Sequence, residues 1–261
     1  MITVTNPVLT AFGREGSIGV GIPTRKGGSG GTIRDVFDVV ASVARRSLPA
    51  THLLAVQRHF AEVLLASQNI GLAEYRLAEI LDGSISGACT ATWPVQALPA
   101  LRARPAHTAW RLTGELHATP NVGSAWYLVT APVRLGADQP VSLSLLSSEQ
   151  DGLYRATHKA DRGDDFASIS AVDVFFRGDE ILETDVAQVH DRLSRFAGLM
   201  RCAIEVGRLN GLSDSLRTAA ASMNQSRAQR ITSHLFEGVH ESNGLPSGSM
   251  LKDAIRALRL M

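Results

Sequence analysis

The spacing of apolar residues changes twice along the chain. Between residues 33 and 81, apolar side chains recur at steps of three and four, which is typical of amphipathic helices. From residue 84 to about 176 they form short β-rich runs, and after Asp179 the helical spacing returns. We therefore predict an α+β fold with an N-terminal helical domain, a middle β domain and a C-terminal helical region, over residues 1–83, 84–180 and 181–261.

The N-terminal block combines a glycine-rich stretch with three helices. Residues 13–31 carry so much glycine that we expect a loop there. Thr32 follows as the N-cap of a helix that Pro49 ends, and Asp82-Gly83 closes the third helix. The helices are expected over residues 33–48, 51–68 and 72–81.

Four runs in the middle block have the character of strands, with β-branched and aromatic residues between turn residues. They cover residues 109–116, 125–133, 141–146 and 167–176. Short strands at this spacing predict a small antiparallel barrel or sandwich.

A long helix that we expect to run past Arg217 opens the C-terminal block. Gly207 and Gly211 lie inside it, and because glycine costs about 1 kcal/mol against alanine in a helix, they indicate close packing against another element. A short last helix is expected over residues 250–260. Because it is small for the apolar stripe of the long helix, we expect homo- or hetero-oligomers.

The composition excludes several classes of protein. With 44% hydrophobic and 20% charged residues in 261, the chain has the composition of a folded globular protein. A net charge of +1 provides no broad positive field, so nucleic-acid binding is not expected. The two cysteines are too few for a disulfide framework and predict a reduced, cytoplasmic protein. No apolar run is long enough to span a membrane, and the eight histidines show no metal-ligand spacing. We therefore expect a soluble protein without membrane association or bound metal.

Four stretches occur in an order and at a spacing that one family shares. They are Gly21-Ile22-Pro23 with Gly27–Gly31 and Asp35; Gly87–Pro94; Leu112-Thr113-Gly114 through Thr119, Asn121 and Ala125; and the helix around Gly207. With them, the chain resembles the acyl-CoA dehydrogenase superfamily of FAD-dependent enzymes over about residues 13–225.

The chain also departs from this family. Trp93 stands where the family has Glu, Ala118 stands where a tryptophan commonly covers the flavin, and Pro120 stands near its Thr or Ser. Most of the family's C-terminal helical bundle, which supplies FAD contacts and usually the catalytic glutamate, has no counterpart. The chain therefore resembles a shortened or divergent member of the family, with an incomplete C-terminal helical region.

The resemblance implies an FAD-dependent oxidoreductase that removes hydrogen from the α,β bond of an acyl-CoA or acyl-carrier thioester. The flavin contacts that it implies are Thr90, Thr92, Ala118 and Thr119. The alternative is that Thr92 and Thr119 are ordinary strand residues that do not contact a flavin. No residue is assigned as the catalytic base: Glu205 lies on the long helix, but it falls outside the family's position for that base.

Two further functions stay open. The first is a non-catalytic or partner subunit of a heteromeric acyl-CoA dehydrogenase-like complex, and the second is a flavin-dependent monooxygenase of the same fold. Arg102, Arg104 and Arg111 could bind the phosphates of coenzyme A or of a carrier arm, although scattered surface arginines are commoner.

Overall fold

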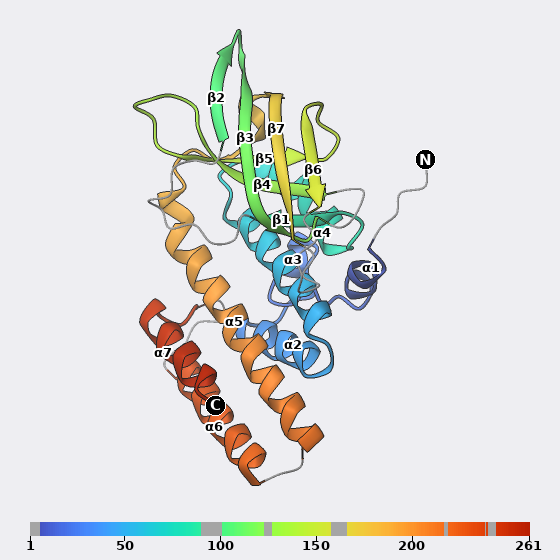
Figure 1. Cartoon of the computed structure of the whole chain (residues 1–261), viewed down its shortest axis with the longest axis vertical. Coiled ribbons are helices and arrows are strands. Elements are labelled where there is room, and N and C mark those ends of the chain that lie inside the picture. The colour runs from blue at the N-terminus through green and yellow to red at the C-terminus, as the bar shows by residue number, and fades with distance from the viewer. Residues whose placement is uncertain are drawn as a thin grey trace. The chain divides into compact units, whose positions relative to one another are not determined.

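The computed structural model describes residues 6–89, 101–122, 127–157, 166–216, 219–237, 239 and 244–261 (Figure 1). Contacts divide the chain into two compact units. Unit 1 comprises Met1–Ile18 and Val56–His190, and unit 2 comprises Gly19–Ala55 and Asp191–Met261. The helices α3 (Leu48–Ala66) and α5 (Ala187–Leu216) have residues in both units. The domain boundaries expected near residues 83 and 180 stay a prediction.

The order of elements confirms the α+β class: helices, then a β segment, then helices. Besides parts of α3 and α5, unit 1 contains α1 (Pro7–Arg14), α4 (Ile70–Leu81), β1 (Ser86–Cys89), β2 (Leu101–Ala106), β3 (Ala109–Pro120), β4 (Tyr127–Arg134), β5 (Ser142–Ser147), β6 (Leu153–Thr157), β7 (Phe166–Phe176) and β8 (Ile181–Glu183). Unit 2 contains α2 (Ile33–Arg46), α6 (Ala219–Phe236) and α7 (Gly248–Arg259).

The sheet is mixed, which corrects the prediction of an antiparallel one. Among the described residues it has eight strands in the order β6-β7-β3-β2-β4-β5-β8, with β1 beside β4. β1 and β2 both run parallel to β4, and the other pairs are antiparallel. Apolar side chains from β1 to β7 form one buried cluster. β4 and β5 are buried almost throughout, so the alternation of serine and leucine in β5 does not mark a solvent-exposed face.

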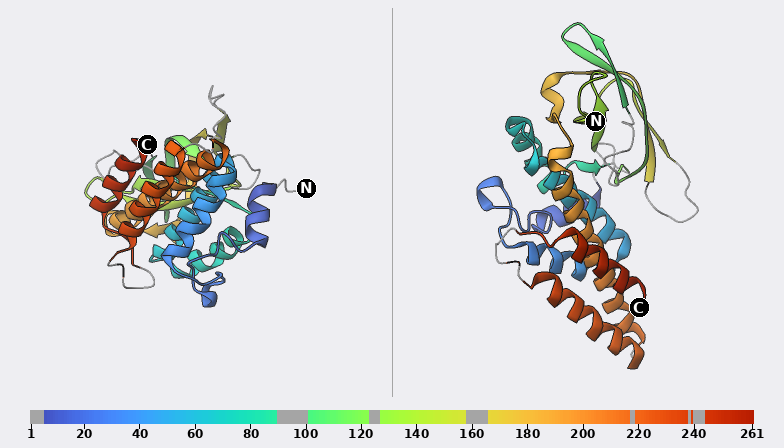
Figure 2. Two further views of the ribbon diagram at one scale, coloured as in Figure 1. Left: turned by 90° about the horizontal axis from the view of Figure 1, so that it is seen from below. Right: turned by 90° about the vertical axis from the view of Figure 1, so that its left-hand side faces the viewer.

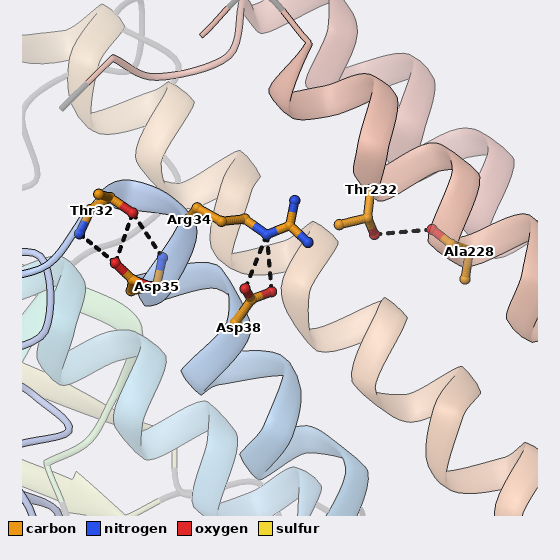
Figure 3. Close-up of polar contacts among 6 residues, drawn as sticks. All are labelled: Thr32, Arg34, Asp35, Asp38, Ala228 and Thr232. Carbon is orange, nitrogen blue, oxygen red and sulfur yellow. Dashed lines mark hydrogen bonds and ion pairs between the residues drawn. The ribbon is translucent and has the colours of Figure 1, made fainter. Parts of the chain in front are cut away.

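Unit 2 begins with an ordered turn and a capped helix. In the glycine-rich stretch, Gly21 N–H donates to the Gly30 carbonyl at 2.7 Å, so this loop has its own hydrogen bonds. Thr32 and Asp35 form the expected cap of α2: the hydroxyl of Thr32 accepts from Asp35 N–H at 3.3 Å, and Oδ2 of Asp35 accepts from Thr32 N–H at 2.7 Å (Figure 3). Pro49 does not end α2. It is the second residue of α3, where its missing N–H costs no hydrogen bond.

The three C-terminal helices of unit 2 pack side by side (Figure 2). The Ser213 hydroxyl donates to the Ala221 carbonyl at 2.7 Å, linking α5 to α6, and Nδ2 of Asn224 donates to the carbonyl of Met261 beyond α7 at 3.2 Å. The long helix expected to run past Arg217 is α5, whose last residue is Leu216.

The close packing expected at Gly207 and Gly211 is confirmed. A Cβ at Gly207 would collide with the carbonyl oxygen of Ala41 on α2, and one at Gly211 would lie 2.7 Å from the carbonyl oxygen of Arg45. The guanidinium of Arg45 also pairs with the carboxylate of Asp214, one turn further along α5. The spacing of four therefore places both glycines on the side of α5 that touches α2.

Candidate functional site

A corner of unit 1 joins α3, β1 and the end of β3. The fully buried Gln57 donates from Nε2 to the carbonyls of Ile80 at 2.9 Å and Ile85 at 2.8 Å, while its Oε1 accepts from Gly87 N–H at 2.8 Å. Asn121 follows β3 directly, and its Nδ2 donates to Oε1 of Gln57 at 3.0 Å and to the Gly87 carbonyl at 2.9 Å. We call Gln57, Gly87 and Asn121 the amide corner.

The residue types at this corner follow from its geometry. Asn121 has φ +63°, in the left-handed region that asparagine tolerates better than most residues. A Cβ at Gly87 would collide with the ring of Phe60 on α3, so only glycine lets β1 lie this close to the helix. The corner thereby fixes the end of β1 against the end of β3.

β3 carries two of the predicted flavin contacts, Ala118 and Thr119. It pairs with β2 as far as Gly114, and beyond that residue the described strands give it one neighbour, β7. The register with β7 shifts between Leu116 and Thr119, which places a β-bulge beside Ala118. Thr119 is fully buried, and its hydroxyl donates to the Leu116 carbonyl at 3.4 Å.

The other two predicted contacts, Thr90 and Thr92, lie outside the described residues. β1 ends at Cys89, one residue before Thr90. Because Asn121 bonds to Gly87, the structure brings together the strand that leads to these threonines and the end of the strand that carries Thr119. All four contacts stay predictions.

Both cysteines are poor nucleophiles. Burial raises the pKa of the Cys89 thiol to about 12, although a hydrogen bond with Thr130 opposes the shift. Burial also raises the pKa of Cys202 to about 12, and the charge of Glu205 adds to this effect. Neither thiol is a thiolate near neutral pH, so neither is suited to nucleophilic catalysis.

Glu205, considered above as a base, is ion-paired with its neighbour on α5. Its Oε2 lies 2.8 Å from Nε of Arg208, and its side chain is 22% exposed. This arrangement is typical of a helix-surface pair. It gives no support for a proton-abstracting role.

The three arginines singled out in the sequence lie on the exposed face of β2 and β3. Arg104 and Arg111 are register partners, and both contact Asp173 of β7: Nη2 of Arg104 lies 3.2 Å from Oδ1, and Nη1 of Arg111 donates to its carbonyl at 3.0 Å. The guanidinium of Arg111 also lies 5.2 Å from the ring centroid of Phe175. Arg102 is exposed on the same strand as Arg104. Phosphate binding there stays a prediction.

A buried ion pair on α3 was not predicted from the sequence. Nη1 of Arg58 lies 3.0 Å from Oε2 of Glu62, and the two side chains are 3% and 7% exposed. The signal available was charge at an i, i+4 spacing within an otherwise apolar helix. Gln57 was also missed, because a single amide in an apolar stretch does not reveal its hydrogen-bond partners.

Two other kinds of feature are absent from the part of the chain that the structure describes. No group of His, Cys, Asp or Glu among the described residues is arranged to hold a metal ion. None of the helices described here combines the length and the apolar character needed to cross a membrane.

Comparisons with known proteins inform on the fold alone. No protein-family model matches the chain. No curated protein sequence matches it either. Butyryl-CoA dehydrogenase from Megasphaera elsdenii is similar in structure, with a TM-score of 0.79 and 14% identity over 96% of this chain and 75% of that chain.

A second similar chain comes from a structure of the electron transferring flavoprotein of Acidaminococcus fermentans, determined towards a mechanism of flavin-based electron bifurcation. Its TM-score is also 0.79, with 14% identity over 96% of this chain and 74% of that chain. The chain therefore has the fold of the acyl-CoA dehydrogenases, and the resemblance noted in the sequence is confirmed at this level.

Proposed function

We propose that the chain is an FAD-dependent oxidoreductase that dehydrogenates an acyl thioester between Cα and Cβ. The observation that carries the proposal is the likeness in fold to butyryl-CoA dehydrogenase, which extends over 96% of the chain. Because one fold can host several functions, the residues at the implied flavin site must also suit the cofactor.

The end of β3 suits a flat ring with polar edge atoms. Beyond Gly114, the described part of the sheet leaves one side of this strand without a neighbouring strand, so main-chain groups near Ala118 and Thr119 have no strand partner on that side. The Thr119 hydroxyl is already bonded to Leu116, so its main chain is the better candidate. Thr90 and Thr92 would add hydroxyl contacts, and FAD would supply the hydride acceptor.

A second function is favoured by the departures from the family and by the Glu205–Arg208 ion pair. Dehydrogenation needs a carboxylate to remove the α-proton, and among the described residues we assign none to this role. A partner subunit of a heteromeric complex would need no base of its own. We therefore keep this function as the alternative, with the base supplied by another chain.

A spectroscopic experiment tests both functions. The purified chain is mixed with FAD, freed of unbound cofactor, and its visible spectrum is recorded before and after anaerobic addition of butyryl-CoA. A flavin band that butyryl-CoA bleaches is the expected result.

Each other result rejects part of the proposal. A bound flavin that thioesters leave oxidised, but that a second chain renders bleachable, favours the partner subunit. A flavin that consumes oxygen after chemical reduction and ignores thioesters favours the monooxygenase. A chain that takes up no flavin, alone or with a partner chain, rejects both the dehydrogenase and the monooxygenase.

A further inference from the structure

The charged residues are unevenly distributed along the chain. Residues 138–185 contain eleven acidic and four basic residues, whereas residues 192–261 contain ten basic and five acidic residues. The net charge of +1 therefore combines an acidic segment, which lies in unit 1, with a basic segment, which lies in unit 2. Because one chain carries both signs, two copies of it can attract each other.

The basic segment ends in α6 and α7, where the cations follow the helical spacing. On each helix three exposed residues recur at i, i+4 and i+7, so each set forms one stripe along its helix. The sets are Met223, Arg227 and Arg230 on α6 and Lys252, Arg256 and Arg259 on α7. Against these five cations the two helices contain a single acidic residue, Asp253.

Both stripes lie on the side of unit 2 that faces away from α5. α7 packs on α5 through Leu251, whose carbonyl oxygen lies 3.8 Å from Sγ of Cys202, and α6 is linked to α5 by the Ser213–Ala221 hydrogen bond. α6 and α7 also lie side by side (Figure 2). On each helix the buried residues lie on the other side from the stripe: Ala221, Ala228, Thr232 and Leu235 on α6, and Leu251, Ala254 and Leu258 on α7. We call the two stripes together the basic face.

The charges of the basic face are not compensated within the chain. No residue that the structure describes forms an ion pair with any of its five cations. Four of the five are arginines, whose planar guanidinium binds a carboxylate through two parallel hydrogen bonds. Arginine and methionine are also enriched at protein interfaces, whereas lysine is depleted there. The basic face therefore fits a protein surface that is rich in carboxylates.

A surface of this kind lies at the turn between β5 and β6. Glu149 and Asp151 of this turn are exposed, and neither forms an ion pair with a residue in the described part of the chain. Between them, Gln150 donates from Nε2 to Oε1 of Glu180 at 2.7 Å, so a third carboxylate lies beside the turn. We call Glu149, Asp151 and Glu180 the acidic turn.

We propose that the basic face is a docking surface for the acidic turn of a second copy of this chain. The carboxylates of one copy pair with the arginines of α6 and α7 in the other. Met223 and Leu260, which are 72% and 78% exposed, lie next to the hydrogen-bonded Asn224 and Met261 and add an apolar contact at one end of the face. Each copy carries both surfaces, so each can bind with either one. This inference does not depend on the proposed function.

Two charge-reversed variants of the full chain test the docking. The first carries Arg227→Glu and Arg256→Glu in the basic face, and the second carries Glu149→Lys and Asp151→Lys in the acidic turn. Sedimentation velocity measures the association of each variant, of their equimolar mixture and of wild type, at low and at high salt. The melting temperature shows whether each variant folds, and if a double variant does not, Arg227→Glu and Glu149→Lys are mixed as single substitutions.

The matched control changes the net charge equally at another place in unit 2. It carries Arg25→Glu and Arg46→Glu, at two exposed cations that form no ion pair with the described residues. We expect wild type and control to associate at low salt and to dissociate at high salt, because salt screens the attraction. Each reversed variant alone should associate more weakly by about tenfold or more, since like charges then face each other. The mixture should associate as wild type does, because opposite charges again meet.

The mixture is the decisive measurement, because no general loss of stability in the two variants could restore association. The inference is wrong if wild type stays monomeric at low salt, if the reversed variants associate as wild type does, or if their mixture does not associate. It is also wrong if the control loses association to the same extent. A monomeric wild type that sediments with phosphatidylserine vesicles would assign the basic face to lipid phosphates and overturn the inference as well.

Discussion

The amide corner of unit 1 and the contact of α2 with α5 in unit 2 both bring main chain close to a neighbouring element, and each requires glycine. At Gly87 the neighbour is an aromatic ring, and at Gly207 it is a helix carbonyl. The corner is held by hydrogen bonds with fixed directions from Gln57 and Asn121. The helix contact depends on shape, since any side chain at Gly207 would separate the helices.

These two kinds of contact suit different purposes. Directional bonds place particular atoms at particular points, which a binding site requires. Packing by shape holds elements together without specifying any polar atom, which is sufficient for a scaffold. The following experiments test two expectations. The hydrogen bonds should make the amide corner rigid, and the contact between α2 and α5 should not tolerate added side-chain volume.

Thiol reactivity gives the largest expected effect, because each region contains one buried cysteine. The pKa values of Cys89 and Cys202 are raised from 9.0 to about 12, which lowers the thiolate fraction at pH 8 about a thousandfold. Iodoacetamide should therefore label neither residue in the native protein and both in urea, as read by mass spectrometry of peptides. Rapid native labelling of Cys89 alone would show that β1 opens readily and that the amide corner is not rigid.

Removing one member of the buried ion pair beside Gln57 should be the most destabilising single substitution tested. Arg58→Met leaves the Glu62 carboxylate in a buried position without this guanidinium, at a cost of about 3–5 kcal/mol in the free energy of unfolding. Urea denaturation measures it. The control is Arg34→Met, which breaks the exposed pair with Asp38 (Figure 3) and should cost no more than about 1 kcal/mol. Equal losses in the two variants would contradict the burial of the first pair.

The helix contact should respond to one methyl group. Gly207→Ala places Cβ against the Ala41 carbonyl and should destabilise the protein by about 1–3 kcal/mol, because main chain must shift. Gly71→Ala in α4 is the matched control: its Cβ would meet no atom within 4 Å, so it should be neutral or stabilising by up to about 1 kcal/mol. Thermal or urea unfolding measures both. A Gly207→Ala variant as stable as wild type would show that α2 and α5 lie farther apart than this contact implies.

The smallest expected effect is a pH dependence at the cap of α2. The main-chain N–H of Thr32 first, and then its hydroxyl, lower the pKa of the Asp35 carboxyl below 3.8. The stabilisation is therefore complete above the unfolded pKa and is lost as the pH falls through the folded one. Asp35→Asn should melt earlier than wild type near neutral pH, and the difference should shrink at more acidic pH. A difference that is the same at every pH would contradict the role of the charge.

Periodicity explains which elements could be predicted from the sequence. The cap at Thr32, the two glycines on α5 and the β3, β4, β5 and β7 strands all carry their signal within a few residues. β1, β6 and β8 have at most five residues each, and β2 contains two arginines and a proline, so none of these strands has a clear local pattern. The parallel pairs with β4 were missed for this reason.

The candidate site was harder to predict because its bonds join distant residues. Asn121 bonds to a side chain 64 positions earlier, and nothing near Gln57 in the sequence marks it as the partner. Thr119 was singled out for its hydroxyl, but that hydroxyl is bonded within its own strand. Residue type and position along the chain indicated a region, and the tertiary contacts show which of its polar atoms are bonded.

From Gln57 to Leu64, every residue of α3 except His59 is buried, so this stretch has no solvent-facing side. In a saturation-mutagenesis scan, substitutions should be poorly tolerated at consecutive positions of this stretch. In α7, whose buried residues are Leu251, Ala254 and Leu258, sensitive positions should instead recur every three or four residues. Protein engineers placing a fluorophore or an affinity handle should avoid this block. Divergence between homologues should be slowest along it, because change at one position requires change in what surrounds it.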